Sequence, residues 1–234
     1  MCMKNKLNIT YTFTTKADKN LAFHVNDNPL HVVQNHKELA RKQHYKFQNL
    51  VHMKQIHSNI VHIVDENDNF DNPPTCDALI TNKKDVPLMV MVADCSPVIF
   101  SDVIDGVIAV AHAGRAGAFK NIIQNVVDSF VNEFHAKKEN IHVEIGASIG
   151  VCCYEVGEEI YEEAKALGFE YAVQLRNSNY YLDIKAILKQ QLINAGVKNF
   201  IISEYCNCCN SETYFSYRKE KETGRFAGVV TLKE

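Results

Sequence analysis

Three apolar runs lie close together in the middle of the chain and restrict the folds open to it. They cover residues 88–93, 98–100 and 107–111, and only the short polar breaks DCSP and SDVIDG separate them. Asp105 and Gly106 suit a tight hairpin, whereas Pro97 is expected to forbid a regular strand through its position. Strands grouped in this way, without strict alternation of strand and helix, favour mixed sheets covered by helices.

The rest of the chain supplies further strands and several amphipathic helices. We predict strands at 8–14, 47–53, 59–64, 141–145, 200–205 and 225–232, and helices at 30–45, 117–135, 156–167 and 183–195. Residues 65–75 are acidic, rich in Asn and broken by Pro, which indicates a surface loop and not a domain boundary. The prediction is therefore one α/β domain of the α+β type over residues 1–234, a layered sandwich of mixed sheets and helices.

Composition and charge exclude several classes of protein. Apolar residues make up 46% and charged residues 23% of the chain, which is typical of globular proteins. A formal net charge of -3 without a long basic block gives no footprint for nucleic acid or for an anionic membrane surface. The first residues lack the apolar core of a signal peptide, and no run is long enough to span a membrane. We expect a cytoplasmic protein; the sequence leaves its oligomeric state open.

Three residues that can bind a metal stand at or near strand ends. Cys95 and His112 follow two of the central apolar runs, and His57 lies on the expected loop before residue 59. Zinc accepts Cys and neutral His together, and three protein ligands with one open position are typical of a catalytic zinc site. Asp94 is expected to act as an acceptor that orients an imidazole.

The same residues have a second interpretation. Cys95 beside His112 can form a thiolate–imidazolium nucleophile pair without a metal. The spacings of 38 and 17 residues between His57, Cys95 and His112 match no regular zinc motif. Spacing alone therefore leaves both interpretations open.

The remaining cysteines and a local HxE pattern give weaker signals. The sequence CNCCN at residues 206–210 resembles half of a metal knuckle, but no second ligand pair is near it in the sequence, so we expect loop thiols. Of the adjacent Cys152 and Cys153, one is expected in the core. The HxE at residues 36–38 lacks the PCxxC that completes a zinc-deaminase signature, so we regard it as a chance match.

Three arginines are candidate ligands for an anion. Arg218 and Arg225 flank a charged turn, and a guanidinium binds phosphate through two hydrogen bonds, although a hairpin with solvated charges is the alternative. Arg115 stands at the head of an expected helix, where a bound anion would relieve its repulsion from the helix dipole. The aromatic residues at 214, 215 and 217 suit either stacking on a base or packing in the core.

A series of motifs carries a resemblance to a known family. In order they are QIHSNIV, CDALIT, VADCSPVIF, AVAHAGRAG, IGASIGVCCYEVGEE, YLDI and YFSYRKEKETGRFAGVV. With these motifs in this order, the chain resembles the YfiH-type laccase-domain, or polyphenol-oxidase-like, family from about residue 26 onwards.

The resemblance implies an activity and roles for individual residues. Members are described as zinc-dependent purine nucleoside phosphorylases that also deaminate adenosine and phosphorolyse methylthioadenosine. By this likeness the zinc ligands are His57, Cys95 and His112, and the substrates are a purine nucleoside and inorganic phosphate. Asp94 or Glu155 is then the candidate proton carrier. The candidate substrate and phosphate contacts are Tyr154, Arg115, Arg218 and Arg225.

The chain departs from the family pattern at several positions. HAGRAG replaces the usual HAGWRG, so that Arg115 stands in place of Trp, and the prolines of IGPSIGPCC are Ala147 and Val151. The second Arg of FSYRR is Lys219. Two alternative functions are weighed beside the phosphorylase: a copper-dependent polyphenol oxidase, which a chain without an HxH motif does not favour, and a catalytically weak nucleoside-binding protein.

Overall fold

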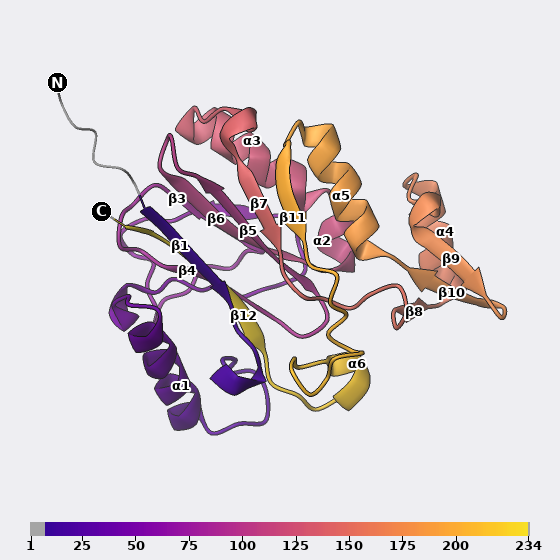
Figure 1. The fold of residues 1–234 in the computed structure, drawn as a ribbon, viewed down its shortest axis with the longest axis horizontal. Helices are drawn as coiled ribbons and strands as arrows, with labels where there is room; N and C mark the ends of the chain where they lie inside the picture. The colour runs from indigo at the N-terminus through magenta and orange to yellow at the C-terminus, as the bar shows by residue number, and fades with distance from the viewer. Residues whose placement is uncertain (1–7, 234) are drawn as a thin grey trace.

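Four layers of helices and sheets make up the computed structural model, which describes residues 8–233. A six-stranded sheet carries α3 (Ile122–Phe134) and α5 (Ile184–Ala195) on one face and a three-stranded sheet on the other. The outer face of the three-stranded sheet is covered by α1 (Pro29–Lys42), as Figure 1 shows. Mixed sheets covered by helices were the prediction, and this fold class is confirmed.

The six-stranded sheet has the order β11-β7-β5-β6-β3-β2. Its outer pairs, β11 with β7 and β2 with β3, are parallel, and the pairs between them are antiparallel. The strands are β2 (Val61–Ile63), β3 (Ala78–Thr81), β5 (Ser96–Asp102), β6 (Val107–Ala113), β7 (His142–Ile145) and β11 (Asn199–Ile202). The turn between β5 and β6 contains Gly106 at φ 68°, so the predicted hairpin is confirmed.

The three-stranded sheet has the order β1-β12-β4, with β1 (Asn8–Phe13), β12 (Phe226–Lys233) and β4 (Leu88–Val92). Alternate side chains of β4 serve two cores. Val90 and Val92 pack toward the six-stranded sheet, whereas Met89 and Met91 pack beneath α1. Because both faces are buried, this strand reads as an unbroken apolar run and not as an alternating one.

A third, small sheet lies beside α4 (Glu158–Ala166), at the end of the molecule opposite α1 in Figure 1. Its order is β8-β10-β9, with β8 (Glu155–Val156), β9 (Val173–Arg176) and β10 (Asn179–Leu182). The pattern analysis predicts none of these strands, and it starts the helix at 156, inside β8. The short helix α6 (Tyr217–Glu220) is also outside the prediction.

The segment after the second histidine of the candidate site forms two helices and not one. The apolar stripe predicts a single helix over 117–135, but α2 (Arg115–Phe119) ends before Asn121, and α3 begins after it. Asn121 has φ 59° and ψ 48°. Asn tolerates this left-handed conformation better than most residues, and a single residue in it breaks the helix without disturbing the apolar spacing.

Two other predictions of local structure are wrong. Residues 47–53 form a 3-10 turn, Phe47–Asn49, and an isolated bridge at Val51 instead of a strand. Pro97 lies inside β5. Its carbonyl accepts a bond from the Gly146 amide on the β7 side, whereas the amide of its β6 partner, His112, donates to Asp77 on the opposite side. The missing Pro97 amide therefore removes no bond between β5 and β6.

Within residues 8–233, no helix combines the length and apolar character needed to cross a bilayer. The prediction that the chain start is not a signal peptide concerns residues 1–7 in part, and these, with Cys2, lie outside the described residues.

Candidate metal centre

Three side chains far apart in the sequence meet at one end of the six-stranded sheet. Among His57, Cys95 and His112, one ligand atom from each lies within 4.8 Å of the others. The two imidazole rings are 4.7 Å apart between centroids and inclined at 77°. The predicted convergence of these residues is present in the structure, as an arrangement that can hold a metal ion.

Strand pairing explains why these residues meet. Cys95 immediately precedes β5, and His112 is the last residue but one of β6. Because Pro97 of β5 pairs with His112, Cys95 and His112 lie at the same end of these two neighbouring strands. The third ligand, His57, comes from the loop before β2. Gln55 fixes that loop to β4, because its amide side chain donates to the Met91 carbonyl at 2.8 Å and accepts from the Met91 amide at 3.0 Å.

Asp77 is the acceptor that orients the imidazole, and sequence analysis assigned this role to Asp94 instead. The fully buried Asp77 carboxylate accepts from His112 Nδ1 at 2.8 Å, from the His57 amide at 3.0 Å and from the Ser58 amide at 2.6 Å. Because Nδ1 of His112 is engaged, Nε2 remains for a metal. Asp77 stands in the motif CDALIT, but nothing in its sequence neighbourhood marks a buried carboxylate.

Asp94 holds a different part of the molecule. Its carboxylate accepts from Asn207 Nδ2 at 3.0 Å, from the Ser216 hydroxyl at 2.7 Å and from the Arg218 amide at 2.7 Å. Its backbone has φ 93°, a region that residues other than Gly occupy at a cost. These contacts connect the residue before Cys95 to the loop that leads into α6.

The charges around Cys95 favour a thiolate. Burial by itself raises the pKa of the Cys95 thiol, but the neighbouring His112 and His57 lower it to about 6. For His112, burial works toward a lower pKa, and Cys95 and Asp77 together raise it to about 9. Burial also opposes ionisation of Asp77, yet hydrogen bonds from His112 and Ser58 hold its pKa well below the usual range. One thiolate and two imidazoles form a donor set that zinc accepts.

Gly114, which follows β6, leaves room for the ligands. A Cβ atom at this position would lie 2.7 Å from Cys95 Sγ and 3.5 Å from His57 Cδ2. No side chain fits there without displacing the thiol, which accounts for Gly in HAGRAG.

A cavity of about 1100 Å³ opens over the three ligands. Its wall combines aromatic and apolar side chains with four cations. The aromatic residues are Phe23, Phe70, Tyr154 and Tyr217, and the cations are Lys54, Arg218, Lys221 and Arg225. Of these, sequence analysis named Tyr154, Tyr217, Arg218 and Arg225, and Lys221 lies in the same motif as the two arginines. Phe23, Lys54 and Phe70 belong to segments without a recognisable motif. The aromatic residues at 214, 215 and 217 lie in the irregular segment and in α6, and only Tyr217 reaches this cavity.

Arg218 is held in place at the cavity wall. Its Nη1 donates to the carbonyls of Cys153 at 3.1 Å and Glu155 at 2.9 Å, and its guanidinium lies 5.3 Å from the Tyr154 ring centroid. Arg225 donates through Nη1 to the carbonyls of Thr223 and Gly224.

Two predicted site residues lie outside the lining of the cavity. Arg115 pairs with Glu163 on α4 at 2.6 Å. Glu155 accepts a hydrogen bond from Tyr181 at 3.1 Å, and its side chain is exposed. Their roles stay predictions. The HxE histidine, His36, is buried and bonded to the Leu21 carbonyl, while Glu38 pairs with Lys19 at the surface; no metal cluster of described residues includes either.

Comparisons with known proteins agree with this architecture. The family model described as multi-copper polyphenol oxidoreductase laccase matches residues 11–233. A Corynebacterium glutamicum protein named purine nucleoside phosphorylase is 37% identical over 217 residues, which cover 92% of this chain and 87% of that protein. The Escherichia coli purine nucleoside phosphorylase YfiH is 31% identical over 216 residues, 91% of this chain and 86% of that protein.

Solved structures show the same fold. The crystal structure of the Bacillus licheniformis protein YfiH has a TM-score of 0.90 at 28% identity and covers 96% of this chain and 93% of its own. That of YlmD from Geobacillus stearothermophilus has a TM-score of 0.85 at 27% identity, with 98% and 93% covered. The match over nearly the whole chain, together with these relatives, establishes that the chain belongs to the laccase-domain family of YfiH and YlmD.

Proposed function

We propose that this protein is a zinc-dependent purine nucleoside phosphorylase. The observation that carries the proposal is the meeting of His57, Cys95 and His112 at the base of a cavity walled by cations and aromatic rings. The names of its relatives support the same activity. When bound there, a zinc ion supplies a Lewis acid with an open coordination position.

The cavity wall matches the two substrates. A purine has an apolar face that stacks on aromatic rings, which Tyr154 and Phe70 offer. Inorganic phosphate requires cationic donors, and Arg218, Lys221 and Arg225 stand along the same wall. Arg218 is held in place by two carbonyls, so little side-chain entropy is lost when it binds an anion.

In phosphorolysis, a phosphate oxygen forms a bond to ribose C1′ while the bond from C1′ to the purine nitrogen breaks. The purine leaves with the bonding electrons and takes up a proton, giving the free base and ribose 1-phosphate. The cations hold the phosphate beside C1′ and neutralise its charge. Asp94 and Glu155 are the proposed proton carriers; Asp94 lines the cavity, next to Cys95.

The proposal includes adenosine deamination at the same site. In that reaction water replaces the amino group at purine C6, and ammonia leaves. The resemblance of the motifs supports this second activity, and no relative named above carries it in its name.

The family description favours a second candidate, a copper-dependent phenol oxidase. Two His and one Cys form a set that copper also accepts. Oxygen reduction at a multicopper cluster needs many more histidines, and among residues 8–233 the second group of potential metal ligands consists of cysteines alone. The phosphorylase is therefore the better match to this chain.

The test measures the products formed from adenosine by zinc-loaded protein, with and without phosphate. Adenine and ribose 1-phosphate that appear only with phosphate, and inosine that appears without it, are expected. Cys95→Ala should abolish both, whereas His62→Ala, a matched change on nearby β2 outside the cavity, should leave both intact. Zinc-bound, folded protein that binds adenosine without turnover would contradict the proposal in favour of a binding protein, and oxygen uptake on a phenol would favour the oxidase.

A further inference from the structure

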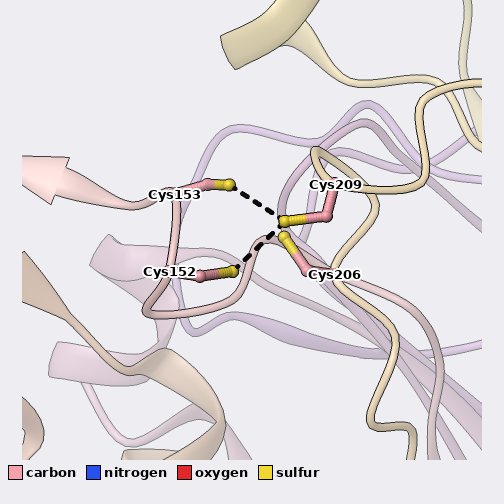
Figure 2. A group of neighbouring side chains, drawn as sticks. All are labelled: Cys152, Cys153, Cys206 and Cys209. Carbon is pink, nitrogen blue, oxygen red and sulfur yellow. Dashed lines mark hydrogen bonds between the residues drawn. The ribbon is translucent and has the colours of Figure 1, made fainter.

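Four cysteines on two distant loops form a compact group that the proposed reaction does not use. Cys152 and Cys153 lie between β7 and β8, and Cys206 and Cys209 lie after β11. Their sulfur atoms all lie within 4.8 Å of one another. Figure 2 shows all four side chains directed toward one point, with Cys209 Sγ at 3.5 Å from Cys152 Sγ and 3.3 Å from Cys153 Sγ.

The group corrects two expectations from the sequence. In the sequence, CNCCN has no second pair of ligands near it. The fold supplies that pair from residues 152 and 153, which lie 57 and 56 residues from Cys209 in the sequence. Neither Cys152 nor Cys153 is a core residue; one is exposed and the other half-buried. No disulfide joins cysteines within the described part of the chain, where all seven are free.

Backbone contacts fix the two loops against each other. Ser148 and Cys206 form an isolated parallel bridge, with the Asn207 amide bonded to the Ser148 carbonyl at 3.2 Å. The Asn210 amide and its side chain both donate to the Cys206 carbonyl, at 3.0 and 2.8 Å. The four sulfur atoms are thus brought together by the fold and not by flexible loops meeting at random.

The sulfur of Cys206 also accepts from the backbone. The Gly150 amide donates to it at 3.2 Å. Amide donors at the first sulfur of a Cys-x-x-Cys turn stabilise the charge that a metal-bound thiolate carries.

Geometry and chemistry select the occupant. A tetrahedral zinc ion with bonds of about 2.3 Å to sulfur requires sulfur atoms about 3.8 Å apart. Cys209 Sγ lies 3.5 and 3.3 Å from its two partners on the other loop, and no separation in the group exceeds 4.8 Å, so the spacing is close to that value. Four sulfur ligands in a tetrahedron are typical of zinc or of iron–sulfur sites. Sulfur atoms that all lie within 4.8 Å of one another leave room for one ion and not for a cluster with inorganic sulfide, so a single zinc ion is the better match.

We propose that Cys152, Cys153, Cys206 and Cys209 bind a second, structural zinc ion, which joins the loop after β7 to the loop after β11. Each thiol that becomes a ligand gives its proton to solvent, and no oxidant is required. This site is independent of the proposed catalytic centre and uses none of its ligands.

The second site would hold the wall of the cavity. Asn207, between two of its ligands, donates to Asp94 and to the Phe215 carbonyl at 2.8 Å. Cys153 offers its carbonyl to Arg218. Zinc at this point therefore fixes both the acceptor that precedes Cys95 and the arginine proposed to bind phosphate.

The test counts zinc per folded chain by mass spectrometry of the metal, after purification with reductant and exchange into zinc-buffered solution. Wild type should retain two zinc ions and Cys209→Ser one. Cys95→Ala should also retain one, because it removes a ligand of the other centre. Cys208→Ser is the matched control: Cys208 lies in the same turn but outside the group of four, and this variant should keep both ions.

Zinc X-ray absorption on the unmodified protein keeps the proposal testable if Cys209→Ser fails to fold. Two zinc sites should together show more sulfur than nitrogen ligands, at about 2.3 Å, whereas the His57–Cys95–His112 centre alone gives one sulfur per zinc. Any one of three results would overturn the proposal. They are one sulfur ligand per zinc, equal zinc content in wild type and folded Cys209→Ser, and a disulfide within the group in protein kept reduced. Activity is not a readout, so failure of the proposed function leaves this test intact.

Discussion

One buried carboxylate organises the candidate metal centre. Asp77 bonds the ring of His112 and the backbone on which His57 stands, so that one side chain fixes two of the three ligands. Its charge also raises the basicity of the His112 ring, which strengthens the ring as a ligand. The acceptor is therefore as much a part of the candidate centre as the three residues that could bind the metal.

Replacing Asp77 tests this role. Asp77→Asn keeps the size of the side chain but removes its charge. The new amide group also points N–H donors at the His57 amide, the Ser58 amide or His112 Nδ1, which are donors themselves. We expect zinc affinity at the centre to fall about 10- to 100-fold, measured by competition with a chelator. Asp68→Asn is the matched control, since Asp68 accepts from His62 at 2.7 Å away from the centre. Equal affinity in Asp77→Asn and wild type would contradict the assignment.

The space beside Cys95 depends on Gly114. Because a Cβ there would lie 2.7 Å from Cys95 Sγ, Gly114→Ala should displace the thiol and lower zinc affinity by about tenfold or more. In Gly157→Ala the new Cβ meets only the flexible end of Glu159, so this control should bind zinc as wild type does. The zinc affinity of both metal-free variants can be measured by isothermal titration calorimetry. Equal zinc affinities for Gly114→Ala and Gly157→Ala would contradict the role given to Gly114.

At the level of elements, the long buried strands were predictable from the sequence and the small sheet β8-β10-β9 was not. Strands β4 and β6 are continuous apolar runs because both of their faces are buried. Strands β9 and β10 have mostly exposed or half-buried residues and only four residues each, so no periodicity distinguishes them from a loop. The break at Asn121 was hidden for a related reason, since the apolar stripe continues on both sides of it.

The packing of α3 on the six-stranded sheet should account for a large part of the stability. Phe130 is fully buried on α3 and its ring lies 6.2 Å from that of Phe100 on β5. We expect Phe130→Ala to lower the free energy of unfolding by about 3–5 kcal/mol, measured by urea denaturation. Phe134→Ala, on the half-buried last residue of the same helix, should cost clearly less; similar losses for both would be evidence against this packing.

For the molecule as a whole, the sequence located the three candidate metal ligands but not the residues that position them. His57, Cys95 and His112 stand in recognisable motifs at strand ends. Asp77 and the four-cysteine group depend on contacts between segments that only the fold brings together. The spacing of apolar residues along a helix or strand indicates which face of that element is buried. It carries no information on which loops meet in the fold.

His36, a buried histidine of α1, should make the protein sensitive to acid. Burial lowers the pKa of His36 from 6.5 to about 4, although its bond to the Leu21 carbonyl works in the opposite direction. Above pH 6.5 the folded and unfolded chains are both neutral here. As the pH falls from 6.5 toward 4, the unfolded chain takes up a proton first, so stability is lost, by on the order of 3 kcal/mol.

Urea denaturation at a series of pH values measures this loss. His36→Gln keeps a donor for the Leu21 carbonyl and removes the titrating ring, so its stability should depend less on pH between 6.5 and 4. An unchanged slope in this variant would show that other groups cause the acid sensitivity. His52, whose pKa burial also lowers, remains in the variant and should leave a smaller slope.

The pairing of β1 with β12 has a consequence for how the protein is made. Strand β12 lies between β1 and β4, with Asn8 opposite Lys233 and Phe226 opposite Val92. While the ribosome is still adding residue 226, both flanking strands have emerged, and neither has its partner. The facing edges of β1 and β4 therefore stay unpaired, and open to pairing with other chains, until residues 226–233 have emerged and taken their place between them.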